Sequence, residues 1–279
     1  MRGSRDTGTG SPARWGAIVA DLAGRVAVVT GASAGIGEAT ARILGAAGMR
    51  VALCARRKDR LDRLATGLRA LGAEAAAHAL DVTDAPAVGE MIRDVTARWG
   101  RLDVLVNNAG RGLAAKFEDT TPEELRGVME LNVVAVLTAT QAALPVMRRQ
   151  ARGHIINVSS IVGRRGVPYR AAYGATKFAL GGLSEALRVE LRGTGIAVSL
   201  VYPVQTATEF HEAQVQKVPW QPVGPGQSAE QVARAILRCV CRPRPEVYPY
   251  WPARLLAILS VIAPALVDRG MNRMLRPPE

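Results

Sequence analysis

Short, continuously apolar runs alternate along this chain with longer segments of helical periodicity, and this alternation constrains its fold more than any other feature. The apolar runs cover residues 25–30, 50–54, 103–106, 154–158 and 196–201, with a further run ending at residue 80. The segments with helical periodicity cover residues 35–47, 58–71, 84–99 and 171–192. A strand that is apolar throughout is buried on both faces, so the pattern predicts an α/β, doubly wound parallel sheet (a Rossmann fold).

The chain has 279 residues, which is long enough for one large α/β domain that buries roughly three quarters of its unfolded surface. We expect a flexible extension over residues 1–20, a single Rossmann-type domain over 21–250, and an apolar and basic extension over 251–279. Within the domain, residues 204–227 are expected to form a loop at the ligand site. Another helix is predicted after Thr121, because a threonine cap followed by proline and two glutamates favours a helix start.

The formal net charge is +12, and arginine supplies nearly all of the positive charge, since only four lysines are present. A basic balance favours a nucleic acid, an anionic membrane or a phosphorylated ligand as partner, although an arginine-rich genome gives the same composition. Aromatic residues make up only 4% of the chain and no nucleic-acid-binding motif occurs. These two observations argue against nucleic acid as the partner.

The three cysteines, Cys54, Cys239 and Cys241, are too few for a disulfide framework and lack the further ligands of a metal site. They are predicted to be reduced and structural, as in a cytoplasmic protein. The N-terminal apolar stretch is interrupted by Asp21 and is too short for a secretory signal. We therefore expect a cytoplasmic protein without a metal ion.

A glycine-rich turn with the sequence Gly31-Ala-Ser33-Ala-Gly35-Ile36-Gly37 falls between the first apolar run and the first predicted helix. Glycine permits a tight turn and a close approach of the backbone to a pyrophosphate, while the helix start offers free N–H groups to the anion. The turn is therefore predicted to bind a dinucleotide through Gly31, Ser33, Gly35, Ile36 and Gly37.

The end of the second apolar run indicates which dinucleotide is bound. NAD-binding sites usually carry an acid there that holds the ribose 2′-hydroxyl, whereas an arginine accommodates a 2′-phosphate. Ala55 stands where the acid is expected and Arg56 follows it, which favours NADP(H) over NAD(H). The alternative is that Arg56 and Arg57 are solvated residues at the start of a helix.

Tyr173 and Lys177 stand four residues apart in the helix predicted over 171–192, so they share one face of it. A phenol with a pKa near ~10 is a poor base at neutral pH unless a neighbouring cation stabilises its anion. The ammonium group of Lys177 would provide that cation. The pair by itself is a common pattern and carries little weight.

Five motifs occur together, in order and at the predicted strand ends. They are Gly31-x-x-x-Gly35-x-Gly37, Asn107-Asn-Ala-Gly110, Asn132, Ser160 and Tyr173-x-x-x-Lys177. Together they resemble the short-chain dehydrogenase/reductase family, in its compact single-domain branch, over residues 22–240. The resemblance implies an NADP(H)-dependent oxidoreductase that transfers a hydride between nicotinamide and a carbonyl or secondary alcohol of a small molecule. It also implies a homo-oligomer, either a dimer or a tetramer.

The resemblance implies four catalytic residues. Tyr173 would transfer the proton, and Lys177 would lower the pKa of that tyrosine and bind the nicotinamide ribose. Ser160, thirteen positions before the tyrosine, would orient the substrate oxygen. Asn132 would bend its helix and hold a water against the lysine, whereas Ser159 is expected to satisfy backbone groups.

The resemblance also implies further cofactor contacts. Asp81 and Val82 would contact the adenine ring, and the segment Asn108-Ala109-Gly110 would line the adenosine side and brace the sheet. These residues follow the third and fourth predicted strands.

Pro203 and Thr208 resemble the family segment beside the nicotinamide, which is the last of the implied cofactor contacts. In that segment Val204 replaces a glycine and Thr206 replaces an aliphatic residue. Since a valine does not readily adopt a positive φ, this loop is expected to follow a different path from the family's.

Two other functions stay open on the same fold. A catalytically silent NADP(H)-binding sensor or scaffold usually loses the tyrosine or the lysine, and both are present here. An epimerase or dehydratase usually needs a longer C-terminal substrate domain. Net consumption of NADPH with a ketone distinguishes the three functions, because a sensor consumes none and an epimerase regenerates its own.

The predicted loop 204–227 carries several large or apolar side chains. They are Phe210, His211, Val215, Val218 and Trp220. This mixture suits a medium-sized apolar substrate such as a lipid, a steroid or an aromatic ketone, and it equally suits a loop that packs on the domain. His211 is expected to be a loop residue without a catalytic role.

The segment 253–267 is almost wholly apolar and is interrupted by Pro264. The arginines around it are Arg254, Arg269, Arg273 and Arg276. Its fifteen or so residues fall short of the ~20 that span a bilayer. Three interpretations stay open: residues 253–276 lie in a membrane interface with arginines toward anionic headgroups, they cover the substrate pocket, or they contact another subunit. The first adds membrane association to the predicted cytoplasmic location.

Overall fold

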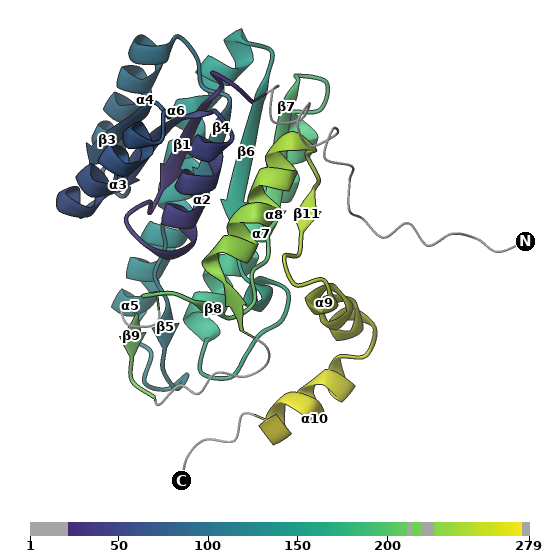
Figure 1. Ribbon diagram of the computed structural model, residues 1–279. Coiled ribbons are helices and arrows are strands. Elements are labelled where there is room, and N and C mark those ends of the chain that lie inside the picture. The colour runs from purple at the N-terminus through teal and green to yellow at the C-terminus, as the bar shows by residue number, and fades with distance from the viewer. Residues whose placement is uncertain (1–21, 211–213, 219–225, 275–279) are drawn as a thin grey trace, which may run out of the picture.

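The computed structural model describes residues 22–210, 214–218 and 226–274 (Figure 1). Its centre is a seven-stranded parallel sheet in the order β11-β7-β6-β4-β1-β2-β3. The strands are β1 (Val26–Thr30), β2 (Arg50–Ala55), β3 (Ala75–Ala79), β4 (Val104–Asn107), β6 (Gly153–Val158), β7 (Ile196–Val201) and β11 (Glu246–Val247). The predicted doubly wound fold is confirmed.

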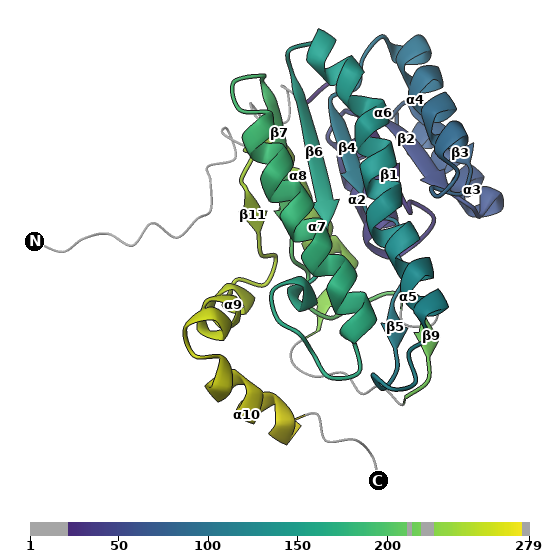
Figure 2. The same ribbon diagram turned by 180° about the vertical axis from the view of Figure 1, so that it is seen from behind.

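Helices cover both faces of the sheet. One face carries α2 (Gly35–Ala46), α3 (Lys58–Ala70) and α8 (Ala229–Cys241) (Figure 1). The opposite face carries α4 (Ala85–Trp99), α6 (Ala135–Arg149) and α7 (Ala171–Glu190) (Figure 2). The strands and helices predicted from the sequence match these elements to within two residues at each end.

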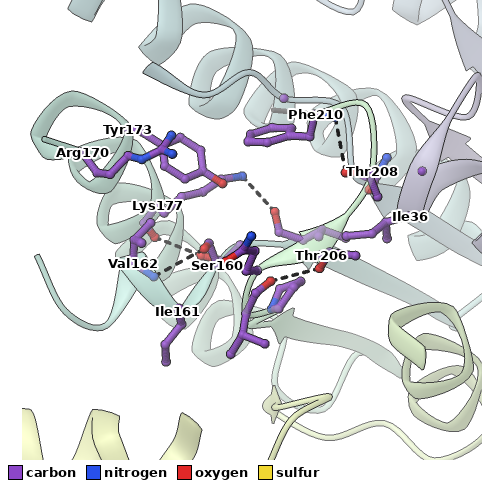
Figure 3. Close-up of a pocket in the computed structure, with 18 of the residues that line it drawn as sticks. Ile36, Ser160, Ile161, Val162, Arg170, Tyr173, Lys177, Thr206, Thr208 and Phe210 are labelled. Carbon is purple, nitrogen blue, oxygen red and sulfur yellow. Dashed lines mark hydrogen bonds between the residues drawn. The ribbon is translucent and has the colours of Figure 1, made fainter. Parts of the chain in front are cut away.

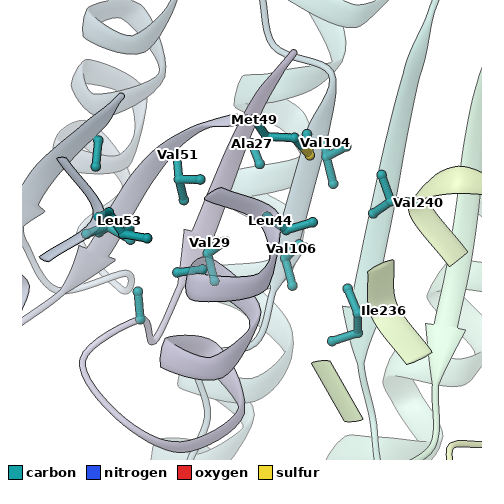
Figure 4. Close-up of a cluster of buried hydrophobic side chains, with 14 of the residues drawn as sticks. Ala27, Val29, Leu44, Met49, Val51, Leu53, Val104, Val106, Ile236 and Val240 are labelled. Atoms are coloured by element: carbon teal, nitrogen blue, oxygen red, sulfur yellow. The ribbon is translucent and has the colours of Figure 1, made fainter. Parts of the chain in front are cut away.

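Each face of the sheet has its own apolar core. In one core Val29 and Leu53 pack with Leu44 of α2 and Ile236 of α8 (Figure 4). The other core takes the alternate strand residues, such as Val28, and packs them against α4 and α6. Because neighbouring residues of a strand point to opposite faces, this double burial explains why the strands are apolar throughout.

A buried carboxylate holds the two central strands together where they begin. Asp103, just before β4, accepts a hydrogen bond at 2.8 Å from the backbone N–H of Val26 in β1. Arg101 donates to the same carboxylate from Nε at 2.7 Å and from Nη2 at 2.6 Å. This bond sets the register in which β1 and β4 run side by side toward their carboxyl ends.

The long helix predicted after Thr121 is interrupted. Thr121 and Glu124 form a capping box at the start of α5 (Pro122–Met129), as the sequence indicates. A π-helical turn, η1 (Glu130–Val134), then separates α5 from α6. Such a turn widens the helix by one residue and often occurs at functional sites. Here it places the fully buried side chain of Asn132 toward the interior.

Two small strand pairs lie outside the main sheet, and the sequence pattern does not predict them because each strand has two residues. β8 (Thr206–Ala207) pairs with β10 (Gln227–Ser228), and β5 (Leu113–Ala114) pairs with β9 (Val215–Gln216). The first pair joins the two ends of the predicted loop 204–227 to each other, and the second holds its middle, at Val215 and Gln216, against Leu113 and Ala114. His211 and Trp220 lie outside the described residues.

The C-terminal apolar segment forms two helices, α9 (Pro252–Ile262) and α10 (Pro264–Met274), bent by 120°. The bend follows from Pro264, since a proline ring clashes with the preceding helical turn. Both helices lie beyond the carboxyl ends of the strands (Figures 1 and 2). The last strand before these helices, β11, is short, because it pairs with β7 only through Glu246 and Val247.

One long helix of the described chain has the length and composition of a membrane span. It comprises α5, η1 and α6 over Pro122–Arg149, and 44% of its most apolar window is buried inside the fold. α9 and α10 pass the same test only as a bent pair. The long helix is therefore accounted for by the core that it covers.

We expect Asp103→Ala to lower the free energy of unfolding by about 2–3 kcal/mol, because it leaves the buried N–H of Val26 without its acceptor. The control is Asp62→Ala, which breaks an exposed pair with Lys58 on α3 and is expected to cost about 0.5 kcal/mol or less. Urea denaturation of both variants measures the difference. Equal losses would contradict a structural role for the buried carboxylate.

Candidate active site

A cavity of about 870 Å³ lies at the carboxyl edge of the sheet. It gathers segments that follow six different strands of the main sheet, together with the start of α7 and parts of α9 and α10. The residues of its wall that the sequence singled out are Gly31, Ser33, Gly35, Ile36, Arg56, Asp81, Val82, Asn108, Ala109, Gly110, Ser160, Tyr173, Lys177, Pro203 and Thr208. Gly37 and Asn132 lie behind this wall.

The glycine-rich turn between β1 and α2 is packed so closely that side chains do not fit. A Cβ atom on Gly37 would lie 2.3 Å from the carbonyl oxygen of Gly31, and one on Gly31 would lie 2.8 Å from Nδ2 of Asn108. No described side chain caps α2, whose N-cap residue is Ala34. The first N–H groups of α2 therefore face the cavity as an uncapped helix end, which suits a phosphate.

A serine and two arginines lie at the outer end of this turn. Arg57 donates to Oγ of Ser33 from Nε at 3.1 Å and from Nη2 at 3.0 Å. Arg56 is 78% exposed and lies 3.8 Å from the carboxylate of Asp81. The sequence assigned a phosphate contact to Arg56 alone. The structure adds Arg57, which the same pattern of two arginines in place of an acid could have indicated.

Hydrogen bonds hold the segment after β4 against the glycine-rich turn. Oγ1 of Thr30 accepts from the backbone N–H groups of Asn108 at 3.0 Å and Ala109 at 3.1 Å. Nδ2 of Asn108 donates to the carbonyl of Thr30 at 2.9 Å. Deeper in the sheet, Asn107 donates to Asn157 of β6 at 2.8 Å. The bracing expected of this segment is confirmed.

Asp81 is oriented by the residue two positions after it. The backbone N–H and the hydroxyl of Thr83 donate to its Oδ1 at 3.0 and 2.8 Å. The first of these bonds is the main cause that lowers the pKa of Asp81, with the hydroxyl and the charge of Arg56 contributing in the same direction. The carboxylate is thus ionised and fixed at the wall of the cavity.

Tyr173, Lys177 and Ser160 come together on the side of the cavity opposite the glycine-rich turn (Figure 3). Nζ of Lys177 lies 5.7 Å from the centre of the Tyr173 ring and donates to the carbonyl of Val158 at 3.0 Å. Ser159 donates to the carbonyl of Lys177 at 3.3 Å, which is the backbone role that the sequence predicts for it. Both serines line the cavity, and Ser160 is the one whose side chain hydrogen-bonds with Tyr173.

Burial shifts both ionisable groups toward their neutral forms. It raises the pKa of Tyr173 to about 12, against which a hydrogen bond with Ser160 and the charge of Arg170 act. It lowers the pKa of Lys177 to about 8. The lysine was expected to be the cation that lowers the pKa of the tyrosine. The structure adds the guanidinium of Arg170 as a cation that lowers this pKa.

Arg170 is the residue of this site that the sequence did not single out. It is buried at the N-terminus of α7, lies in the cavity wall, and donates to Oε1 of Gln214. The preceding residue, Tyr169, has a φ of 63°, a left-handed backbone conformation that residues other than glycine rarely adopt. The place of Arg170 in the sequence, three residues before Tyr173, could have indicated that it belongs to the site.

Asn132 does not line the cavity but supports it from behind. Its Nδ2 donates to Oγ1 of Thr176 at 3.0 Å and to the carbonyl of Arg111 at 2.9 Å, and its Oδ1 accepts from the N–H of Arg111 at 2.9 Å. A Cβ on Gly110 would lie 3.0 Å from this Oδ1 and 3.8 Å from Nζ of Lys177. Asn132 therefore connects the segment after β4 to α7, close to the lysine.

The start of the loop 204–227 closes one side of the cavity. Thr208 packs on Gly35, where a Cβ would lie 2.9 Å from its methyl group. The ring of Phe210 is tilted against Tyr173 with a centroid distance of 5.8 Å. Glu209 accepts from Arg57 at 2.9 Å and from Arg60 at 2.6 Å.

Val204 does not adopt a positive φ, and the described non-glycine residues that do are Ala151 and Tyr169. The loop therefore begins in a conformation that valine accepts. Further along, Val215 packs near Leu113, and neither Val215 nor Val218 belongs to the cavity wall.

A model of the short chain dehydrogenase family matches residues 25–219, more than half of the chain. The chain belongs to the short-chain dehydrogenase/reductase family. It is 32% identical over 271 residues to dehydrogenase/reductase SDR family member 7B of Bos taurus, covering 92% of this chain and 83% of that protein. The chain is thus an oxidoreductase of this family.

Two solved structures of the family carry nicotinamide dinucleotides. An alcohol dehydrogenase from Thermococcus sibiricus, complexed with 5-hydroxy-NADP, is 32% identical with a TM-score of 0.72 and covers 80% of this chain and 95% of its own. A short-chain dehydrogenase/reductase from Burkholderia phymatum in complex with NAD is similar in fold, with a TM-score of 0.80, 24% identity and coverage of 92% and 99%. The first likeness supports a nicotinamide cofactor, and the second shows the fold.

We expect Arg170→Gln to raise the pKa of Tyr173 further, because a cation beside a phenol favours its anion. A reaction that needs the phenolate, such as alcohol oxidation, would then reach its full rate only at higher pH. The measurement is the pH dependence of kcat/KM for alcohol oxidation. Arg126→Gln, on exposed α5, removes the same charge and is expected to leave the profile unchanged. A profile that is identical in both variants would contradict the effect.

Proposed function

We propose that this chain is an NADP(H)-dependent oxidoreductase that interconverts a carbonyl and a secondary alcohol, with Tyr173 as its acid and base. The observation that carries the proposal is the cavity that joins Tyr173, Ser160 and Lys177 to an uncapped helix start and to Arg57. Tyr173, Ser160 and Lys177 suit proton transfer at an oxygen. The uncapped helix start and Arg57 suit a phosphorylated dinucleotide.

The residues present fit an NADP molecule. The start of α2 offers N–H groups to the pyrophosphate, and the glycine-rich turn has no side chain in the way. Ser33, Arg56 and Arg57 offer a hydroxyl and two guanidinium groups to a 2′-phosphate, and Ala55 leaves the end of β2 without an acid. The NADP analogue in the similar Thermococcus sibiricus structure supports this preference.

The adenosine side of the cofactor is assigned to the segments after β3 and β4. Asp81 and Val82 are proposed to contact the adenine ring, and Asn108, Ala109 and Gly110 to line the ribose. On the nicotinamide side we propose Lys177, Pro203 and Thr208, which lie in the wall near Tyr173.

When bound, the nicotinamide supplies or accepts the hydride. In the reductive direction Tyr173 donates its proton to the carbonyl oxygen, and its raised pKa means that it is protonated at neutral pH. The hydroxyl of Ser160 holds that oxygen beside the phenol. Lys177, with a pKa of about 8, is mostly charged at pH 7 and stabilises the phenolate that remains. Arg170 adds a second positive charge, and Asn132 holds the segment next to the lysine.

We propose an apolar carbonyl or alcohol as the substrate class. The wall beyond Ser160 is built from side chains without charge, among them Ile161, Val162, Phe210, Leu256 and Leu259. A hydrocarbon group leaves water on entering such a wall, which favours binding by about 25 cal/mol per Å² of apolar surface. The two C-terminal helices thus contribute to the pocket together with the loop 204–227.

A silent NADP(H)-binding sensor is the alternative function. Intact Ser160, Tyr173 and Lys177 in one cavity favour the enzyme, since a sensor has no need of them. Mixing the protein with NADPH and a panel of aliphatic, aromatic and steroid ketones tests this directly. Net loss of NADPH absorbance supports the reductase, and binding of NADPH without loss supports the sensor.

Tyr173→Phe is expected to lower kcat by roughly 10²–10⁴-fold, because the proton donor is lost, while the Kd for NADPH stays the same. Steady-state kinetics and fluorescence titration of NADPH measure the two quantities. Tyr248→Phe is the matched control, because this tyrosine stacks on Tyr202 outside the cavity. Full turnover by the Tyr173 variant would remove the tyrosine from this role.

Arg57→Ala and Arg56→Ala are each expected to raise the KM for NADPH by about 10-fold or more and to leave the KM for NADH unchanged. A hydrogen bond to a charged group contributes about 1.5–3 kcal/mol, and each 1.4 kcal/mol is tenfold. Arg60→Ala is the control, since Arg60 pairs with Glu209 but does not line the cavity. Equal losses for NADPH and NADH would contradict recognition of the 2′-phosphate.

A further inference from the structure

The helix α9 buries small residues and exposes large apolar ones, which is the reverse of the pattern of a surface helix in water. It turns small residues, Ala253, Ala257 and Ser260, toward the protein, where they are buried. Its large apolar residues point outward with 41–81% of their surface exposed: Leu255, Leu256, Ile258, Leu259, Val261 and Ile262. A helix at a water-facing surface shows the opposite pattern.

These outward residues of α9, together with Trp251 and with Leu266 of α10, form what we call the C-terminal apolar patch. Trp251 is 69% exposed and Leu266 is 58% exposed. An apolar patch rimmed by polar groups on a folded protein marks an interaction site. The question is which partner has chemistry that matches the patch and its rim.

The rim of the patch is positively charged. Arg254, Arg269 and Arg273 are exposed on α9 and α10. The only acid between residues 250 and 274 is Asp268, and it accepts from Arg165 of the main domain. The rim therefore suits an anionic surface, and the patch suits hydrocarbon.

The helices are too short and too sharply bent to cross a bilayer. Each has 11 residues, which corresponds to about 16 Å, and they meet at 120°. The hydrocarbon core of a bilayer is about 30 Å thick. An apolar helix face with arginines at its edge lies in the plane of the interface instead.

The patch is continuous with the wall of the active-site cavity. Leu256, Leu259 and Leu266 line the cavity and have exposed fractions of 42%, 41% and 58%. The two helices lie beyond the carboxyl ends of the strands (Figure 1) and contribute residues to the cavity wall. A surface that covers the patch would thus also face the cavity mouth.

We propose that α9 and α10 dock this enzyme on an anionic phospholipid surface, with the mouth of its cavity toward the bilayer. An apolar carbonyl or alcohol dissolved in the membrane then enters the cavity between Leu256, Leu259 and Leu266 without passing through water. The entry of substrate rests on the proposed function, whereas the docking does not.

A second copy of the chain fits the patch less well. Two patches in contact would place arginine rims close to one another, and Asp268, the one acid available to separate them, is already paired with Arg165. Like charges at an interface disfavour association. An anionic headgroup layer neutralises the same arginines.

The experiment is flotation of the full-length protein with vesicles of phosphatidylcholine, with and without phosphatidylglycerol. We expect the protein to float with the anionic vesicles and to be released as salt is raised. Val261→Glu and Ile262→Glu, on residues outside the cavity wall, are expected to abolish flotation. Leu71→Glu and Val189→Glu, which are similarly exposed at 79% and 71% on other helix ends, are expected to float like the wild type.

Replacing Arg254, Arg269 and Arg273 by glutamine tests the rim. Each cation near an anionic surface contributes about fivefold to the partition constant, so each replacement is expected to weaken binding by about that factor. The emission of Trp251 is expected to shift to the blue with anionic vesicles and to be quenched by brominated lipid. Both changes are expected to be lost in Trp251→Phe.

Absence of flotation with anionic vesicles would overturn the proposal, as would equal flotation of the Val261→Glu and Leu71→Glu variants. A dimer seen by sedimentation without vesicles, and lost in Val261→Glu, would assign the patch to a second copy and also overturn it. Reduction of a water-soluble ketone by NADPH is measured in the same samples. Protein that floats but never consumes NADPH supports docking and contradicts the proposed function alone.

Discussion

Burial of the parallel strands on both faces is the constraint on which the rest of this molecule depends. A strand with a core on each side has no room for an unpaired polar group along its length, so its buried polar side chains need partners, as Ser199 of β7 has in His154 of β6 at 2.7 Å. Asn107 and Asn157, at the ends of β4 and β6, satisfy each other at 2.8 Å. Thr30, at the end of β1, binds the backbone after β4. The site is therefore assembled at one edge of the sheet.

The same burial that builds the cavity opposes the charges inside it. Tyr173 and Lys177 are both driven toward their neutral forms, with pKa values of about 12 and 8. A phenol with such a high pKa is almost fully protonated at neutral pH, so it carries the proton to be donated, but little phenolate is present to accept one. The positive charge of Arg170, at the start of α7, acts against this rise in the pKa of Tyr173. Tyr169, the residue before it, has a left-handed backbone conformation.

The strands, their helices and the cavity edge could be predicted from the sequence, because each depends on residues that are close together in the chain. The spacing of Tyr173 and Lys177 is such a local signal. The pairing of Arg170 with Gln214 spans 44 positions, and that of Arg57 with Glu209 spans 152, so no local pattern reveals either. For α9 the composition predicts an apolar segment, but only tertiary packing decides which face is turned outward.

The helix α9 follows the two-residue strand β11 and buries its small residues, Ala253 and Ala257. A helix with one narrow buried face has most of its circumference exposed. When that remainder carries leucine and isoleucine, as here, a single layer of apolar side chains separates the cavity from its surroundings. The wall of the pocket and the outer surface of the protein are then one structure, and what covers the outside also determines what can enter.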